Sequence, residues 1–271
     1  MEKNDEWALQ IEQKIKYFAE KHSTTYNKKS RELSASFEIG CFHALLNFYE
    51  AKGFTLKIEN PIDSEYRYLT TPNGNPSNFS YVSATGIDGS YEIRQQVRIK
   101  SHLNNDIAFA PDMVVLFKES MISKITDSDY ASGKRPFYSV SSKDVVAAHE
   151  CKSMTPFPEL LVSFVGMFIT AHEWYEQSED NISPLANKGP HLAPTMFVGG
   201  TASALHLRMI QALESVYPIN IVVGLHQGTW NLYANNRKLN KLKFSNNTYA
   251  EVNNNTNLVK HIDLGLDEIP F

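Results

Sequence analysis

The sequence predicts an α/β protein with a central mixed β-sheet flanked by helices. Apolar runs of strand length alternate with segments of helical periodicity, and from about residue 31 they follow the order α-β-β-β-α-β-α-β. A chain of 271 residues that is 42% hydrophobic and 21% charged is typical of a globular protein with a sizeable core. We expect one elaborated domain over residues 1–271, with its core at about 31–225.

Two helices are predicted before the first strand. Residues 5–21 place apolar side chains at helical spacing, namely Trp7, Ile11, Ile15 and Phe18. A second helix is expected from about Arg31 to Lys52, ending at Gly53. Its apolar stripe consists of Leu33, Phe37, Cys41, Ala44 and Phe48.

Three strands are predicted in the middle of the chain. Residues 61–89 are expected to form a long irregular segment. Residues 91–103 alternate between apolar and polar, which predicts a half-exposed strand with a basic outer face. Residues 107–117 predict a second strand, interrupted by Pro111. Residues 118–143 are interpreted as a polar insertion, and 144–152 as a third strand.

The remainder of the chain continues the alternation. Pro156 and Pro158 open an apolar helix expected over 157–177, since proline is tolerated in a first helical turn. A strand, a helix and a buried strand are then expected at 195–198, 201–216 and 219–225. Residues 226–271 are expected to add a hairpin around Asn235-Asn236.

Composition excludes several classes of protein. The net charge of −4 argues against a protein that coats nucleic acid by bulk positive charge. The two cysteines lie far apart in the sequence and form neither a metal-binding Cys/His motif nor a disulfide framework, which favours a reducing compartment. The first ten residues lack the apolar region of a signal peptide, and the apolar run 160–171 is too short to span a bilayer. We therefore expect a soluble, cytoplasmic protein without a membrane partner.

Three side chains form the strongest candidate for a chemical site. Asp112 follows Pro111 at the start of an apolar strand run, and Glu150 and Lys152 end the strand that begins at Asp144. Side chains two positions apart on a strand share a face, so Glu150 and Lys152 should point the same way. If the two strands are neighbours, all three groups meet at one end of the sheet.

Pro111-Asp112, followed by Glu150-Cys151-Lys152 and an apolar helix, resembles the motif of the PD-(D/E)XK, or restriction-endonuclease-like, nuclease superfamily. The resemblance implies a restriction-endonuclease-like core, here with an insertion between the two catalytic strands. It implies Mg²⁺ as cofactor, or Mn²⁺, and Lys152 as a catalytic residue. The implied metal ligands are Asp112, Glu150, the Cys151 backbone carbonyl and Glu38, which is also a candidate catalytic residue.

The same resemblance implies an endonuclease that hydrolyses phosphodiester bonds, with double-stranded DNA as partner and restriction or phage defence as the setting. Cutting two strands normally requires two active sites, so a homo-oligomer is expected. Candidate contacts to the nucleic-acid backbone are the basic residues Arg94, Arg98, Lys100, Lys134 and Arg135.

Two alternatives remain open at this point. The chain could be a catalytically silent nucleic-acid-binding or assembly module on the same fold. It could also be an unrelated α/β protein with an accidental motif, in which case the Asp112 and Glu150 carboxylates should lie more than about 10 Å apart.

Other motifs favour structural roles. The segment His172 to Glu176 begins like a zinc-protease motif but lacks its second histidine. His149 should face away from Glu150, and Glu159 suits the first turn of a helix. Gly199-Gly200-Thr201 lacks the lysine of a phosphate-binding loop, and a threonine N-cap explains it.

Overall fold

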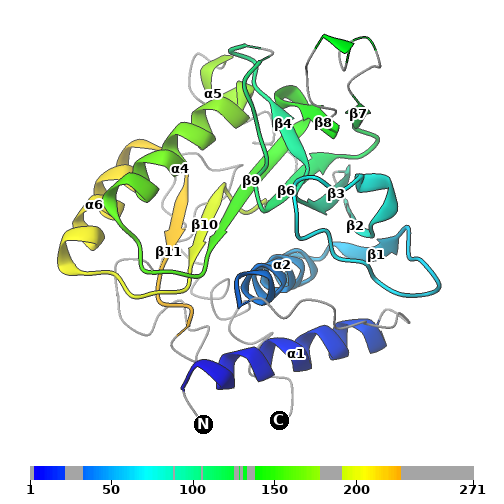
Figure 1. Ribbon diagram of the computed structural model, residues 1–271, viewed down its shortest axis with the longest axis horizontal. Helices are drawn as coiled ribbons and strands as arrows, with labels where there is room; N and C mark the ends of the chain where they lie inside the picture. Colours follow the sequence, from blue (N-terminus) through cyan, green and yellow to red (C-terminus); the bar gives the residue numbers. More distant parts are fainter. Residues whose placement is uncertain are drawn as a thin grey trace.

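The computed structural model describes residues 3–21, 33–87, 89–104, 106–124, 128, 131–132, 138–177 and 191–226. Its centre is a seven-stranded mixed sheet with helices on both faces (Figure 1). In spatial order the strands are β1 (Thr55–Glu59), β2 (Tyr81–Gly86), β3 (Gly89–Gln95), β6 (Met113–Phe117), β9 (Val145–Lys152), β10 (Thr195–Val198) and β11 (Asn220–Val222). The predicted α/β class with a mixed, helix-flanked sheet is confirmed.

The relative direction of neighbouring strands in the large sheet changes at β9. Neighbouring strands from β1 to β9 are antiparallel, whereas β9, β10 and β11 run parallel to one another. Parallel neighbours need a crossover connection. The helices after β9 and β10 supply it, namely α4 (Pro158–Ala171) with the short α5 (Glu173–Gln177), and α6 (Ala204–Val216).

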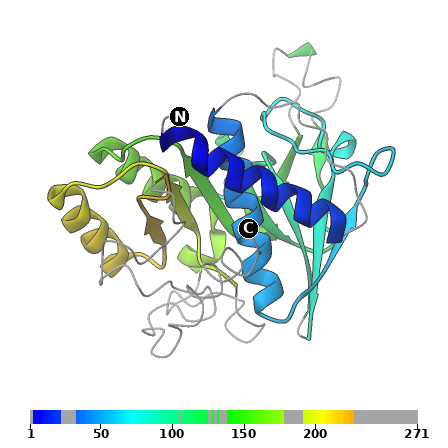
Figure 2. The same cartoon turned by 90° about the horizontal axis from the view of Figure 1, so that it is seen from below.

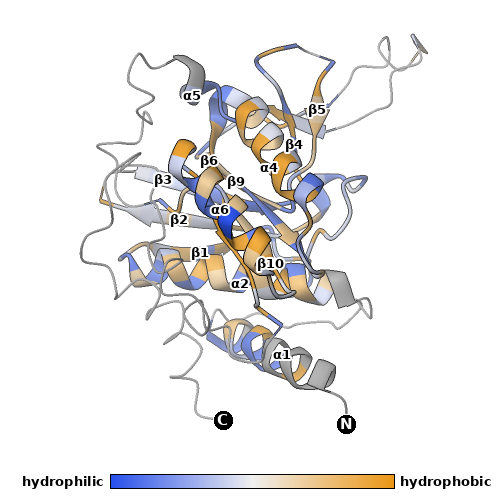
Figure 3. Cartoon of the chain, turned by 90° about the vertical axis from the view of Figure 1, so that its left-hand side faces the viewer, coloured by the Kyte–Doolittle hydropathy of each residue, from blue (hydrophilic) through white to orange (hydrophobic). Residues whose placement is uncertain are grey.

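The two faces of the sheet carry separate cores. On one face α2 (Leu33–Ala51) packs against the sheet, and α1 (Lys3–Lys21) lies across the outer side of α2 (Figure 2). On the other face α4 and α6 cover β10 and β11. Both predicted N-terminal helices are confirmed. The predicted stripe residues Phe37, Cys41, Ala44 and Phe48 are buried, and so are Phe42, Leu45 and Leu46. Hydrophobic colours accordingly occur along much of α2 in Figure 3.

A smaller four-stranded sheet packs on the same face as α4. Its spatial order is β5 (Ala108–Phe109), β4 (Arg98–Lys100), β8 (Tyr138–Ser141) and β7 (Ser123–Lys124). Apolar side chains of β4 and β8, including Ile99 and Val140, meet Val114 and Ala148 of the large sheet. The predicted polar insertion at 118–143 therefore contains two short strands.

Three strand predictions need correction. The single strand predicted at 107–117 is two strands in different sheets, β5 in the smaller sheet and β6 in the large one. Residues 81–86, predicted to belong to an irregular segment, form β2 and pair with both β1 and β3. The single strand predicted at 91–103 is two strands in two different sheets. Gln96, with a left-handed φ of 53°, turns the chain from β3 toward β4, so the predicted half-exposed strand with one basic face does not exist.

Two helix predictions also need correction. The helix expected at 157–177 breaks at His172, whose backbone leaves helical geometry between α4 and α5. α6 begins after Ser203, whose hydroxyl accepts a hydrogen bond from the His206 backbone N–H, so Ser203 and not Thr201 is the N-cap. The hairpin predicted around Asn235-Asn236 lies outside the described residues. Among the described helices, none is long and apolar enough to cross a membrane.

Candidate metal and phosphate site

Asp112 lies where β6 begins, next to the end of β9. β6 and β9 are adjacent and antiparallel, and their last pair is Met113 opposite His149. One position further along this register, Asp112 stands across from Glu150. The long insertion therefore does not separate the two strands: β7 and β8 leave the large sheet and join the smaller one.

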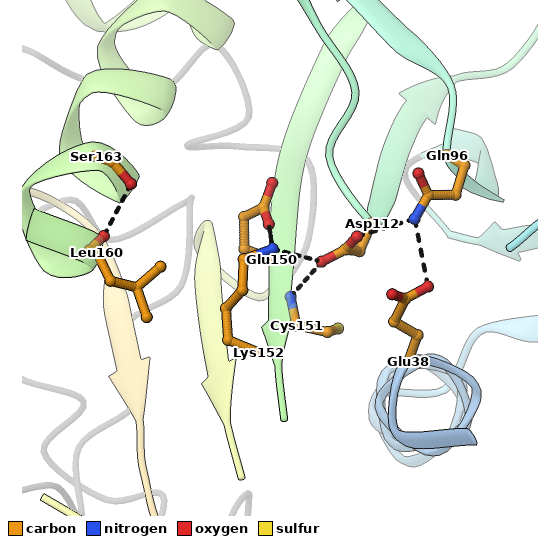
Figure 4. A network of polar contacts seen from close by, with 8 residues as sticks. All are labelled: Glu38, Gln96, Asp112, Glu150, Cys151, Lys152, Leu160 and Ser163. Atoms are coloured by element: carbon orange, nitrogen blue, oxygen red, sulfur yellow. Dashed lines mark hydrogen bonds and ion pairs between the residues drawn. The ribbon is translucent and has the colours of Figure 1, made fainter. Parts of the chain in front are cut away.

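Glu150 and Lys152 share a face of β9, as the strand period predicts. Lys152 Nζ lies 2.6 Å from Glu150 Oε2 and 3.4 Å from Asp112 Oδ2 (Figure 4). Both carboxylates thus contact one ammonium group, and they lie well within the limit of about 10 Å that an accidental motif would exceed. Asp112 is 8% exposed, so the site is largely withdrawn from solvent.

Both oxygens of Asp112 accept hydrogen bonds. Oδ1 accepts from Gln96 Nε2 at 2.9 Å, and Oδ2 accepts from the Cys151 backbone N–H at 2.7 Å. The N–H and C=O of one strand residue face the same edge, so the Cys151 carbonyl also faces the edge nearest Asp112. A carboxylate oxygen has two lone-pair directions, and Oδ2 also lies 3.4 Å from Lys152 Nζ, so Oδ1 is the oxygen that can accept a further interaction.

Burial and neighbouring charges shift the pKa values of Glu150 and Lys152. Burial, followed by the negative charge of Asp112, raises the pKa of Glu150 to about 8, although Lys152 acts in the opposite direction. Burial acts to lower the pKa of Lys152, but the charges of Asp112 and Glu150 outweigh it and raise that pKa. Lys152 is therefore a fixed positive charge at neutral pH, whereas the raised pKa of Glu150 means that this carboxyl is not fully ionised there.

Glu38 reaches the site through an intermediate residue. It lies on α2 at the border of the buried face, and its Oε2 accepts a hydrogen bond from Gln96 Nε2 at 3.3 Å. The same nitrogen contacts Asp112 Oδ1 (Figure 4). Gln96 therefore links Glu38 to Asp112. Nothing in the sequence marked Gln96 as part of the site, because it occurs in an alternating segment that predicted an exposed strand face.

The basic residues predicted to share one strand face lie on different strands. Arg94 lies on β3, donates to Glu92 Oε2 at 2.7 Å and stacks over the Tyr81 ring at 3.5 Å. Arg98 and Lys100 lie on β4 in the smaller sheet, and burial lowers the pKa of Arg98. Because the chain turns at Gln96, these residues do not share one strand face, and their contact with nucleic acid stays a prediction. Lys134 and Arg135 lie outside the described residues.

The histidines near β9 are structural. His149 is buried and accepts a hydrogen bond from the Thr195 backbone N–H, and burial lowers its pKa to about 3. His172 Nε2 accepts from the Ala148 backbone N–H, which leaves Nδ1 to donate to the Phe168 carbonyl at 2.8 Å. Each ring nitrogen of His172 is thus engaged by backbone, as the structural interpretation of the segment at 172–176 requires.

The remaining motifs also have structural explanations. Glu159 is exposed in the first turn of α4, where a carboxylate suits the helix dipole. A Cβ on Gly199 would lie 2.3 Å from the His226 ring, and one on Gly200 would lie 2.5 Å from the Thr155 backbone. Close packing therefore explains the two glycines.

A closed metal cage is absent from the described part of the chain, where no three His, Cys, Asp or Glu side chains are arranged to enclose an ion. Asp112 and Glu150 instead form an open pair of carboxylates beside one lysine. No protein-family model, curated protein or solved structure matches this chain.

Proposed function

We propose that the protein is a Mg²⁺-dependent endonuclease of the PD-(D/E)XK type that hydrolyses phosphodiester bonds in DNA. One observation carries the proposal: Lys152 Nζ contacts the carboxylates of both Asp112 and Glu150, which come from adjacent strands. The sequence order α2, β3, β6, β9, α4, β10 around these residues also supports a restriction-endonuclease-like core.

The donor set suits Mg²⁺ or Mn²⁺. Magnesium prefers one or two carboxylates, with water and phosphate oxygens completing its coordination, so an open pair is suitable and a closed cage is unnecessary. Asp112, Glu150 and the Cys151 carbonyl would hold the ion, with Glu38 connected through Gln96. When bound, the ion would activate water and neutralise charge on the scissile phosphate.

Lys152 contributes a positive charge beside the two carboxylates. Its raised pKa keeps the ammonium protonated, so it can donate hydrogen bonds but cannot accept a proton from water. Its side chain is one-third exposed, more than those of Asp112 and Glu150, which gives an approaching phosphate access to it. Lys152 would therefore orient the attacking water and stabilise charge on the phosphate.

Double-stranded DNA as substrate and assembly into a homo-oligomer belong to the same proposal. Cutting both strands of a duplex requires two active sites, which a symmetric dimer would supply. The net charge of −4 is compatible with a local site in which a divalent cation compensates the carboxylates.

The test is incubation of the purified protein with plasmid and with single-stranded DNA and RNA, each in Mg²⁺, Mn²⁺ and EDTA. We expect cleavage in either metal and none in EDTA. Glu150→Gln should reduce cleavage at least roughly 10²-fold, because a neutral amide cannot replace the charge of a ligand. Glu20→Gln, an exposed position on α1, is the matched control and should cleave like the wild type.

Two outcomes would contradict the proposal. Undiminished cleavage by Glu150→Gln would remove the assigned site. Tight metal-independent nucleic-acid binding with no turnover on any substrate would favour the catalytically silent module instead.

A further inference from the structure

Gln96 has an unusual backbone. It lies between β3 and β4 with a left-handed φ of 53°, a conformation that costs a non-glycine residue about 1 kcal/mol or more. Its backbone N–H donates to the Asp112 carbonyl at 3.1 Å, and its side chain is buried, with the residue 6% exposed. Strained residues that a fold retains are concentrated at functional sites.

The orientation of the Gln96 side chain is determined by its partners. Its amide group faces Asp112 Oδ1 and Glu38 Oε2, both of them carboxylate oxygens that accept hydrogen bonds when ionised. Only the NH₂ end of the amide can donate to both. The two N–H bonds of one nitrogen thus connect an acid of α2 to an acid at the start of β6.

An amide at this position orients the acids without neutralising them. A lysine in the same place would cancel one negative charge and weaken the attraction for a cation, whereas glutamine leaves both charges in place. We propose that Gln96 is a positioning residue for the metal site. It fixes Asp112 and Glu38 relative to each other, with the remaining lone pair of Asp112 Oδ1 available to a divalent cation. This inference rests on the proposed nuclease function.

The test is the affinity of the full-length protein for Mn²⁺ alone, measured by electron paramagnetic resonance of the free ion. The informative variant is Gln96→Asn. Asparagine adopts left-handed backbone more readily than glutamine, so the turn should be retained. Its side chain is one methylene shorter and cannot span the two carboxylates. We expect Mn²⁺ affinity to fall roughly 10- to 100-fold, as for other residues that orient metal ligands.

Two further variants exclude a merely structural effect. Gln95→Asn shortens the neighbouring buried glutamine, whose Oε1 has no hydrogen-bond partner among the described residues, and it should leave Mn²⁺ affinity unchanged. In a Glu38→Gln background, Gln96→Asn should cost less affinity than in the wild type, because one of the two bridged carboxylates is already absent.

The outcomes separate the two proposals. If the wild type binds Mn²⁺ and cleaves DNA while Gln96→Asn binds Mn²⁺ equally well, Gln96 is only a turn residue and this inference is wrong. If the wild type neither binds Mn²⁺ nor cleaves, the proposed function is itself wrong.

Discussion

Lys152→Met is expected to reduce Mg²⁺-dependent cleavage roughly 10²- to 10³-fold, as removal of one charge-stabilising group does in other active sites. Methionine approximates the length of the lysine stem but removes the charge that contacts Asp112 and Glu150. The two carboxylates then lack a positive neighbour, so Mn²⁺ binding should be retained or strengthened. A loss of cleavage together with preserved metal binding would identify Lys152 as a catalytic group and not a ligand.

The control for this variant is Lys143→Met, at an exposed position in the turn that precedes β9. It should cleave at the wild-type rate. Wild-type cleavage by Lys152→Met would show that the ammonium group has no part in the reaction. Loss of metal binding in the same variant would indicate that the site had been disrupted, and thermal unfolding measured in parallel would reveal this.

His172 is expected to make the fold sensitive to acid. It is fully buried, and burial lowers its pKa to about 4 from an ordinary value of 6.5. The unfolded chain therefore binds a proton at His172 at a higher pH than the folded chain does. The contribution of neutral His172 to the free energy of unfolding is complete above about pH 6.5 and is lost as the pH falls toward 4. Proton linkage predicts that this residue lowers the free energy of unfolding by about 2 kcal/mol at pH 5.

The measurement is urea unfolding of the metal-free protein at pH 7 and pH 5. His172→Gln should have a lower free energy of unfolding at pH 7, because it loses hydrogen bonds to Ala148 and Phe168. Between pH 7 and pH 5, however, its free energy of unfolding should fall by about 2 kcal/mol less than that of the wild type. Glu150 acts with the opposite sign, since its raised pKa adds stability as the pH falls. Comparison with the variant therefore isolates the histidine.

His206→Gln, at the partly exposed start of α6, is the matched control for His172→Gln. Glutamine is suited to this position of a capping box, so the helix should be kept. The free energy of unfolding of this control should fall between pH 7 and pH 5 as much as that of the wild type. An equally large fall in His172→Gln would mean that the buried ring does not resist protonation.

The part of the site that lies within one strand could be predicted from the sequence. Glu150 and Lys152 share a face because strand geometry has a period of two residues, and the apolar run from Val145 to Ala148 marks the strand clearly. The position of Asp112 could not be derived in this way. It depends on β6 pairing with β9 across the whole insertion, which is a tertiary contact that no local pattern encodes.

The errors arose where a tertiary contact overrides a local pattern. The alternation over residues 91–103 is real, but the left-handed turn at Gln96 divides it between two sheets, and Gln96, predicted to face solvent, is buried. The apolar periodicity of 157–177 likewise continues through His172, where hydrogen bonds to backbone end α4. In both places a buried polar side chain lies at a break that hydropathy alone does not reveal.

The central claim is that Asp112 and Glu150 hold one divalent metal beside Lys152. The most direct measurement is an anomalous difference map from crystals soaked in Mn²⁺. The proposal predicts a peak bounded by the Asp112 and Glu150 carboxylates and the Cys151 carbonyl, and its loss in Glu150→Gln. A peak elsewhere in the molecule, or none at a Mn²⁺ concentration that supports cleavage, would contradict it.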